Sequence, residues 1–370
     1  MIALDTFSHL QTMLSLGRWL GPWTGASVVP PGVTREEIDV PARRGGDRPM
    51  RAFVYRPPQP RPSGALLLIP GLHYLGPADP RMDRFARVLA ASGILVVAPL
   101  LPDYLALVPS PGVLRDAERA FDALLSVPGR PPGRPGVFSI SFGSLPALHL
   151  ARVRGDEMGS LVVFGGYADF MGTLRFCIAG RPGAAHDPLN RPVVFMNLLP
   201  WISGRPDDPT ALRSAWLRYV KATWGRPEMK ADGRWQAVAR AVADELPPAE
   251  RPLFFMGTGV EPGGDALHQE ALGRARDDFA WLDPGPILPG IRCPVHLVHG
   301  AEDDVIPYEH AMTLARALPQ DRVRGVHLTG LYGHTHKSGF GVDTRALPAL
   351  AREVTTLVRM LSALASAGTG

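Results

Sequence analysis

The residue best suited to do chemistry in this sequence is a serine, Ser141, within the stretch Gly-Val-Phe-Ser-Ile-Ser-Phe-Gly-Ser at residues 136–144. The apolar run before it predicts a buried strand, and the leucine pattern after it predicts a helix. A serine at a strand-to-helix turn sits in a sharp bend that exposes its hydroxyl and requires small residues two positions away on either side. Here these residues are Ser139 and Gly143, where the usual pattern is Gly-x-Ser-x-Gly. Because serine is also a favoured helix N-cap residue, this stretch alone allows either a nucleophile or a cap.

A serine nucleophile needs two partners, and the sequence offers both. A histidine must take the hydroxyl proton, and a carboxylate must orient that histidine. In a parallel sheet both belong in loops at the carboxyl ends of later strands. The acidic loop Gly-Ala-Glu-Asp-Asp-Val-Ile-Pro at 300–307 follows the apolar run 294–299. Likewise, Gly-Leu-Tyr-Gly-His-Thr-His at 330–336 follows the run 323–328.

These motifs stand in the chain order Ser, Asp, His, each after a predicted strand, and the chain therefore resembles the α/β-hydrolase superfamily, as a serine esterase or lipase with a large inserted lid. The resemblance covers roughly residues 36–170 and 290–365. It implies an α/β fold, with a mostly parallel central sheet flanked by helices and an inserted, mainly helical lid. Carried over residue by residue, it implies Ser141 as nucleophile, Asp303 as orienting acid and His334 as base.

The acid has rivals. Glu302 and Asp304 adjoin Asp303, and Asp169 lies in the loop one strand earlier, from which some members of the superfamily take the acid. The spacing of Asp303 from the glycine and the proline that bound its loop favours Asp303.

The base has one rival, His336. His334 is favoured because Gly333 before it leaves room for the loop to approach the serine.

Acyl transfer also needs two backbone N–H donors for the developing oxyanion. One is expected from Phe142, which follows the nucleophile at the positive end of its helix. By resemblance the other comes from the Pro-Gly-Leu-His loop at 70–73, from the N–H of Leu72, where Gly71 allows a close approach. His73 either lines the substrate pocket or hydrogen-bonds its own loop.

The elements that must position these residues follow from hydrophobic patterns. Two short extended stretches joined by a polar turn, 36–42 and 50–55, predict an antiparallel hairpin. From residue 64 apolar strands alternate with amphipathic helices, which predicts a parallel sheet covered on both faces. The predicted strands are 65–69, 94–99, 137–140, 161–164, 294–299 and 323–328, and the predicted helices are 81–91, 113–125, the segment after Ser141, 310–318 and 345–364.

The alternation breaks at about residue 169 and resumes at about 291. The residues between are rich in Pro, Gly and Trp, with helical patches and no clear strand alternation. We therefore expect a mainly helical lid whose aromatic side chains partly face the pocket, which favours an apolar acyl or alcohol group. The predicted division is an N-terminal segment 1–35, a core of 36–170 and 291–370, and an inserted lid 171–290.

Composition excludes several other classes. The chain has 370 residues, 45% hydrophobic and 20% charged, with a net charge of +4 that comes from scattered arginines rather than a basic run, so no nucleic-acid partner is expected. Cys177 and Cys293 are too few for a disulfide framework and fit a reducing cytoplasm. No secretory signal or transmembrane run is evident. His334 and His336 lie two apart in a loop, and neither cysteine has a partner at zinc spacing, so no metal or cofactor is expected.

The sequence thus predicts a cytoplasmic serine hydrolase that cleaves a small-molecule carboxylic ester through an acyl-enzyme. An acyltransferase, a thioesterase or a carbon–carbon bond hydrolase would use the same site. The alternative from another class is a non-catalytic member of the fold that binds a ligand.

Overall fold

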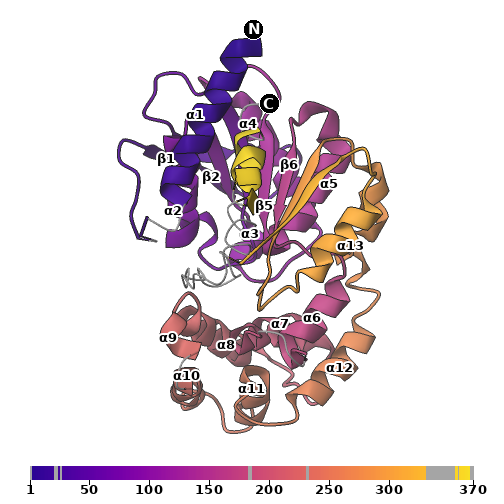
Figure 1. Cartoon of the computed structure of the whole chain (residues 1–370). Coiled ribbons are helices and arrows are strands. Elements are labelled where there is room, and N and C mark those ends of the chain that lie inside the picture. The colour runs from indigo at the N-terminus through magenta and orange to yellow at the C-terminus, as the bar shows by residue number, and fades with distance from the viewer. Residues whose placement is uncertain are drawn as a thin grey trace, which may run out of the picture.

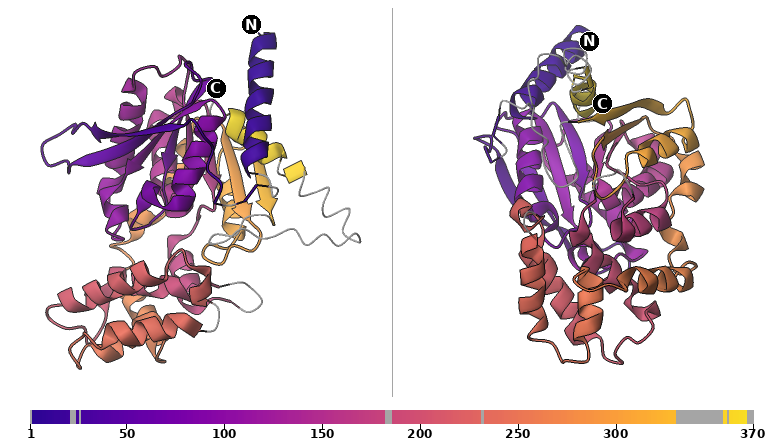
Figure 2. Two further views of the ribbon diagram at one scale, coloured as in Figure 1. Left: turned by 90° about the vertical axis from the view of Figure 1, so that its left-hand side faces the viewer. Right: turned by 60° about the horizontal axis from the view of Figure 1, so that its bottom comes forward.

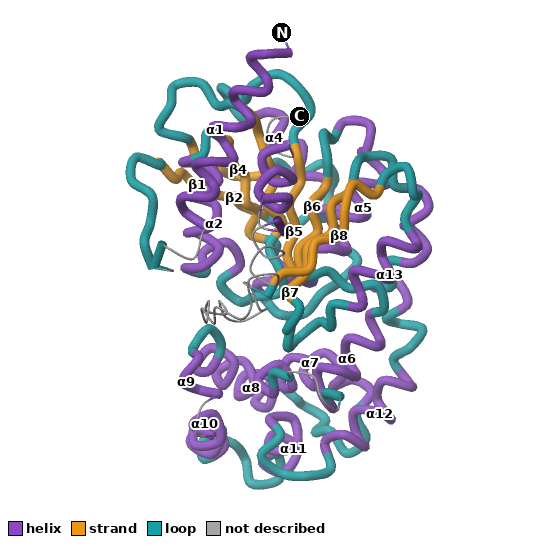
Figure 3. Tube along the Cα trace, viewed as in Figure 1, coloured by secondary structure: helices purple, strands orange, loops and turns teal. Residues whose placement is uncertain are grey.

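The protein is described from a computed structural model, which covers residues 2–20, 24–25, 27–181, 186–230, 233–330, 355–356 and 358–366. An eight-stranded sheet forms its centre, in the order β1-β2-β4-β3-β5-β6-β7-β8 (Figures 1 and 3). The pairs β1–β2 and β2–β4 are antiparallel and all the others are parallel. The strands are β1 (Thr34–Val40), β2 (Met50–Arg56), β3 (Gly64–Ile69), β4 (Ile94–Leu100), β5 (Gly136–Ile140), β6 (Leu161–Phe164), β7 (Val295–Gly300) and β8 (Val323–Thr329).

The sequence of the central strands explains their position. Every residue of β3 is buried, and its alternate side chains enter different cores on the two sides of the sheet. Leu67 and Ile69 pack on one side, and Leu66 and Leu68 on the other. A strand covered on both faces reads as a continuous apolar run, which is the pattern used to predict it. The predicted fold class, a mostly parallel sheet flanked by helices, is confirmed.

Helices cover both faces of the sheet. The first face packs against α4 (Gly112–Ser126), α5 (Ser144–Arg154) and α13 (Glu309–Ala317). The second packs against α1 (Ile2–Leu20), α2 (Pro80–Ala91) and the helical residues 358–366. Figure 2 shows α1 beside these C-terminal residues. The two segments are linked by a hydrogen bond of 3.3 Å between Nε2 of His9 and Oγ of Ser362. Residues 345–354 of the predicted closing helix lie outside the described residues.

Between β6 and β7 the described chain contains helices and turns but no strand, as the sequence indicated. In Figure 1 these helices lie below the sheet, beyond the carboxyl ends of its parallel strands. They pack around a hydrophobic core that contains Phe195, Trp216 and Phe254 and that also takes in Leu145 of α5 and Val305 and Ile306 after β7. We call them the cap helices: α6 (Phe170–Ala179), α7 (Arg191–Leu198), α8 (Thr210–Thr223), α9 (Pro227–Lys230), α10 (Arg234–Ala243), α11 (Arg251–Thr258) and α12 (Gly264–Arg274). The division of the chain into domains stays a prediction.

Candidate active site

Ser141 lies in a strained turn where β5 meets α5. A single 3₁₀ turn, Ser141–Gly143, joins the two elements. Ser141 has a φ of 54°, and in the described part of the chain Leu107 is the other non-glycine residue with a positive φ. The left-handed conformation costs an L-residue about 1–2 kcal/mol, and such strain is concentrated at functional sites. The local sequence therefore folds into the sharp bend that the pattern around Ser141 indicated.

The helix-cap interpretation of Ser141 is wrong. The N-cap residue of α5 is Gly143, and that of the 3₁₀ turn is Ile140. Neither turn nor helix has a side-chain cap hydrogen bond. The hydroxyl of Ser141 makes no hydrogen bond to another described residue and borders a cavity instead.

Two glycines allow the bend to sit against the loop after β3. A Cβ on Gly143 would lie 2.5 Å from the carbonyl oxygen of Pro70 and 2.9 Å from that of Ile69. A Cβ on Gly71 would lie 3.2 Å from the Cβ of Ser141. Since real Cβ atoms do not approach carbonyl oxygens so closely, Gly143 is required by this packing.

Ser139 replaces the glycine that the usual pattern has at this position, and the sheet accommodates it. Its side chain is fully buried, and its Oγ donates to the carbonyl oxygen of Val162 on β6 at 3.5 Å. The bond is long, so it contributes little to stability. The departure from the usual pattern thus leaves the turn at Ser141 intact.

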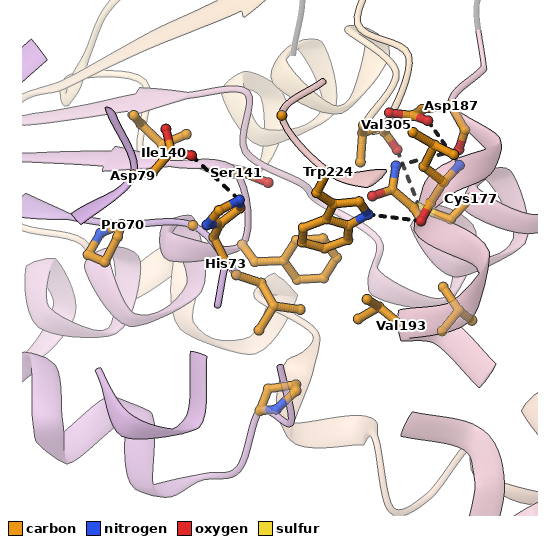
Figure 4. A pocket seen from close by; sticks show the side chains of 18 of the residues that line it. Pro70, His73, Asp79, Ile140, Ser141, Cys177, Asp187, Val193, Trp224 and Val305 are labelled. Carbon is orange, nitrogen blue, oxygen red and sulfur yellow. Dashed lines mark hydrogen bonds and ion pairs between the residues drawn. The ribbon is translucent and has the colours of Figure 1, made fainter. Parts of the chain in front are cut away.

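A cavity of about 450 Å³ opens beside Ser141. Its volume lies within the range of small-molecule sites, roughly 300–1,000 Å³. It is bordered by Ser141, His73, Leu72 and Phe142. Figure 4 shows Ser141 and His73 from close by. The cap helices and their connections supply part of its apolar wall, including Phe170, Leu174, Val193, Val194, Phe279 and Leu282.

The two backbone amides expected to bind an oxyanion both belong to residues at this cavity. Phe142 follows Ser141 directly, and its carbonyl accepts a 2.7 Å hydrogen bond from the buried hydroxyl of Tyr104, which helps to hold the turn. The N–H of Leu72 has no hydrogen-bond acceptor among the described residues. The role of these two amides in binding an oxyanion stays a prediction.

His73 borders the cavity and also hydrogen-bonds its own loop. The two roles that the sequence left as alternatives are therefore both present. Its Nδ1 accepts from the N–H of Leu75 at 3.2 Å, which places the ring proton on Nε2, 3.6 Å from Asp79. The ring stacks on Tyr74 and lies 5.6 Å from the ring of Trp224. Burial lowers the pKa of His73 to about 4, although Asp79 opposes the shift. The ring is therefore neutral near pH 7, and it makes no hydrogen bond to Ser141.

Asp303 is held rigidly in the loop after β7. Its carboxylate is buried, and Oδ1 accepts from the N–H groups of Val305 and Ile306 at 2.9 and 2.7 Å. Its Oδ2 lies 3.4 Å from Nε2 of His299, whose ring nitrogen also contacts the carbonyl oxygen of Ile306 at 2.8 Å. The loop reaches the cavity through Val305.

The rival acids have other contacts. Asp304 pairs with Lys230 at 2.7 Å, and Glu302 is exposed. Asp169 is exposed as well and caps α6, where it accepts from the N–H of Gly172 at 2.9 Å. These contacts favour Asp303 as the acid.

His334 and His336 lie outside the described residues, so the choice of base stays a prediction.

Sequence reasoning missed an ionic group at the cavity wall. Lys230 of the cap lies 2.7 Å from both Asp187 and Asp304, and both carboxylates are buried. The three residues are far apart along the chain, so no local pattern signals their meeting.

Trp224 is one of the lid's aromatic residues, and it lies in the cavity wall. The tryptophan pattern could not distinguish a wall position from a core position, because both are apolar.

Burial raises the pKa of both cysteine thiols, Cys177 and Cys293, to about 12. Both are free and buried. Among the described residues no three His, Cys, Asp or Glu side chains gather in a way that would hold a metal ion.

None of the helices described has both the length and the apolar character to cross a membrane.

No protein-family model matches the chain, and no curated protein sequence matches it. Among solved structures it is similar to an esterase from Pyrococcus furiosus, at 11% identity over 91% of this chain and 92% of that one, with a TM-score of 0.48. It is also similar to a membrane phospholipase A, at 18% identity over 96% and 95% of the chains, with a TM-score of 0.41.

An acylaminoacyl peptidase from Pyrococcus horikoshii is similar at 11% identity and a TM-score of 0.46 over 89% of this chain. The chain spans about two fifths of the length of that peptidase, 40%. At these identities the likeness concerns the fold alone.

Proposed function

We propose that the chain is a serine hydrolase of the α/β-hydrolase fold that cleaves carboxylic esters, a proposal that its eight-stranded, mostly parallel sheet supports. The observation that carries the proposal is the left-handed backbone of Ser141 at a strand-to-helix turn beside a cavity. A hydroxyl in such a turn is accessible to a substrate, and strained backbone of this kind is concentrated at functional sites.

The reaction begins when Oγ of Ser141 attacks the carbonyl carbon of the ester while His334 takes the hydroxyl proton. Asp303 orients and stabilises the protonated histidine. The N–H groups of Leu72 and Phe142 bind the oxygen that becomes negative in the tetrahedral intermediate. When the intermediate collapses, the C–O bond to the alcohol breaks, and the alcohol leaves with the proton from His334.

The acyl group then remains on Ser141 as an ester. A water molecule gives its proton to His334 and attacks the acyl carbon, and the second tetrahedral intermediate releases the carboxylic acid while the proton returns to Ser141. No cofactor is needed for either half of the reaction. The apolar wall of the cavity favours an ester with an apolar group.

The proposal is tested by measuring kcat/KM on p-nitrophenyl butyrate for the wild type and Ser141→Ala. We expect the variant to lose about 10³-fold or more, as in other serine hydrolases that lose the nucleophile. Ser144→Ala is the matched control, because the Ser144 hydroxyl is buried three residues further on and has no hydrogen-bond partner in the part of the chain that the structure describes. The control should stay within about threefold of the wild type. Equal activity of the wild type and Ser141→Ala would end the proposal.

The base is tested with the pair His334→Ala and His336→Ala. We expect a loss of about 10³-fold for the first and a loss below tenfold for the second. The opposite order would assign the base to His336 and leave the nucleophile unchanged.

A further inference from the structure

Asn197 is an uncharged polar residue on the face of a cap helix that borders the cavity. It lies on α7, four residues after Val193, so the two side chains share one face of the helix. Both line the cavity, as does Val194, and Figure 4 shows Val193 there. The other residues of α7 at the cavity are these two valines, so Asn197 brings a carboxamide into an apolar part of the wall.

The two N–H groups of this carboxamide are both used inside the protein. Nδ2 of Asn197 donates to the carbonyl oxygen of Val193 at 2.8 Å and to that of Leu107, also at 2.8 Å. A carbonyl oxygen can only accept a hydrogen bond, so the nitrogen must face both partners and the amide oxygen must point elsewhere. The carboxamide is thus held in a single orientation.

The amide oxygen of Asn197, Oδ1, is left as a hydrogen-bond acceptor. It has no partner in the described part of the chain, yet it is not sealed inside the protein. Because Asn197 lines the cavity, a molecule bound in the cavity can reach this oxygen. A fixed acceptor binds a hydroxyl or an N–H group, and it discriminates against an analogue that lacks such a donor.

The loop that Asn197 holds also supports the turn at Ser141. Leu107, whose carbonyl accepts from Asn197, is fully buried and has a φ of 58°. Its N–H donates to the carbonyl oxygen of Tyr104 at 3.1 Å, and the hydroxyl of Tyr104 donates to that of Phe142 at 2.7 Å. Asn197 therefore lies on the side of the cap that meets the turn at Ser141, and it lines the same cavity as the nucleophile.

We propose that Asn197 is a specificity-determining residue of this site and selects esters whose apolar group carries a hydroxyl or an amide N–H. The inference rests on the proposed function. Small-molecule sites combine apolar walls with a few fixed polar groups that orient the ligand, and Oδ1 of Asn197 is such a group. The donor belongs to the acyl group or to the alcohol of the ester, and the two arms of the test separate these cases.

The test measures kcat/KM on two pairs of esters with the wild type and with Asn197→Leu. The acyl pair is p-nitrophenyl 3-hydroxybutyrate and p-nitrophenyl 3-methoxybutyrate, followed by absorbance. The alcohol pair is 4-hydroxybutyl butyrate and 4-methoxybutyl butyrate, followed by titration of the acid released. In each pair the methyl ether keeps the oxygen and loses the hydrogen-bond donor.

We expect the wild type to prefer the hydroxyl ester about tenfold over its methyl ether in one of the two pairs, which is the gain from one hydrogen bond. In Asn197→Leu this ratio should fall to about one, because leucine keeps the branched shape and removes the acceptor. A ratio set only by the size of the methyl group would not fall. Damaged folding would not change the ratio either, since it lowers both rates together.

Asn190→Leu is the matched control. Asn190 lines the same cavity, but its carboxamide has a single hydrogen bond among the described residues, a long one of 3.5 Å to the carbonyl oxygen of Asp187, and is not fixed by it. The ratio in this variant should stay within about twofold of the wild type. An equal fall in Asn190→Leu and Asn197→Leu would overturn the inference, because the selection would then belong to the polarity of the cavity as a whole.

Wild-type ratios near one in both pairs, or a wild-type ratio that persists in Asn197→Leu, would also overturn the inference and leave the proposed function standing. A wild type that hydrolyses none of the four esters and no p-nitrophenyl butyrate would instead overturn the proposed function itself. If Asn197→Leu does not fold, the same ratio in Asn197→Ser decides. The serine hydroxyl can still donate to the carbonyl oxygen of Val193 one turn earlier, and the variant has no amide oxygen.

Discussion

Replacing Gly143 by alanine tests whether the turn at Ser141 must lie against the loop after β3. The added Cβ would sit 2.5 Å from the carbonyl oxygen of Pro70 and 2.9 Å from that of Ile69. Both neighbours are backbone atoms of a strand end, so no side chain can rotate away. The turn or the loop has to move.

The size of the movement follows from these distances. An ordinary contact begins at 3.4 Å, so the oxygen of Pro70 must retreat from 2.5 to 3.4 Å, which is about 0.9 Å. This displacement separates Ser141 from the amide of Leu72. A misplacement of about 1 Å costs about 10²-fold in rate, and overpacking a core costs about 1–3 kcal/mol in unfolding free energy.

The assay is kcat/KM on p-nitrophenyl butyrate together with urea unfolding of each variant. Gly273→Ala is the matched control, because Gly273 lies in α12 and a Cβ there meets nothing within 4 Å. We expect the control to keep full activity and to gain about 0.5–1 kcal/mol of stability from its higher helix propensity. A folded Gly143→Ala protein with activity within threefold of the wild type would refute the reasoning.

Three further predictions concern other parts of the chain. Ser139→Gly should keep activity within about threefold and lose about 0.5–1 kcal/mol of unfolding free energy, as a strand glycine does; a large loss of kcat would show a role for the hydroxyl. Lys230→Met leaves the buried carboxylates of Asp187 and Asp304 without this cation, so urea unfolding should show a loss of about 2–3 kcal/mol, and a change below about 0.5 kcal/mol would contradict the ionic link. Burial lowers the pKa of His268 to about 4, below the unfolded value of 6.5, so its neutral form stabilises the fold above pH 6.5. As the pH falls from 6.5 to 4 this stability, up to about 3 kcal/mol, is lost, and His268→Leu should show a shallower loss; an equal slope in both proteins would contradict the assignment.

The central strands and the turn at Ser141 were predictable because they depend on local patterns. A strand covered on both faces must be apolar throughout, and β3 and β4 are such runs. The turn at Ser141 was indicated by small residues at fixed spacing. Tolerance of Ser139 was not predictable, since it depends on a carbonyl oxygen of β6.

Which acidic residue orients the catalytic histidine could not be predicted from the sequence, because the candidates differ only in their tertiary contacts. Asp169, Asp303 and Asp304 are equivalent in type, and what separates them is a helix cap, two backbone N–H donors and an ion pair with Lys230. Each of these contacts depends on how distant segments pack. The cap helices are short, and a proline stands first or second in α7, α9 and α11, so each presents little periodicity along the sequence.

The most direct test of the central claim is covalent labelling of the intact protein with a fluorophosphonate, followed by mass spectrometry of its peptides. The account predicts one label per chain, on Ser141, with a parallel loss of ester hydrolysis and no labelling of Ser141→Ala. A label on another serine, or full hydrolysis with Ser141 unmodified, would contradict it.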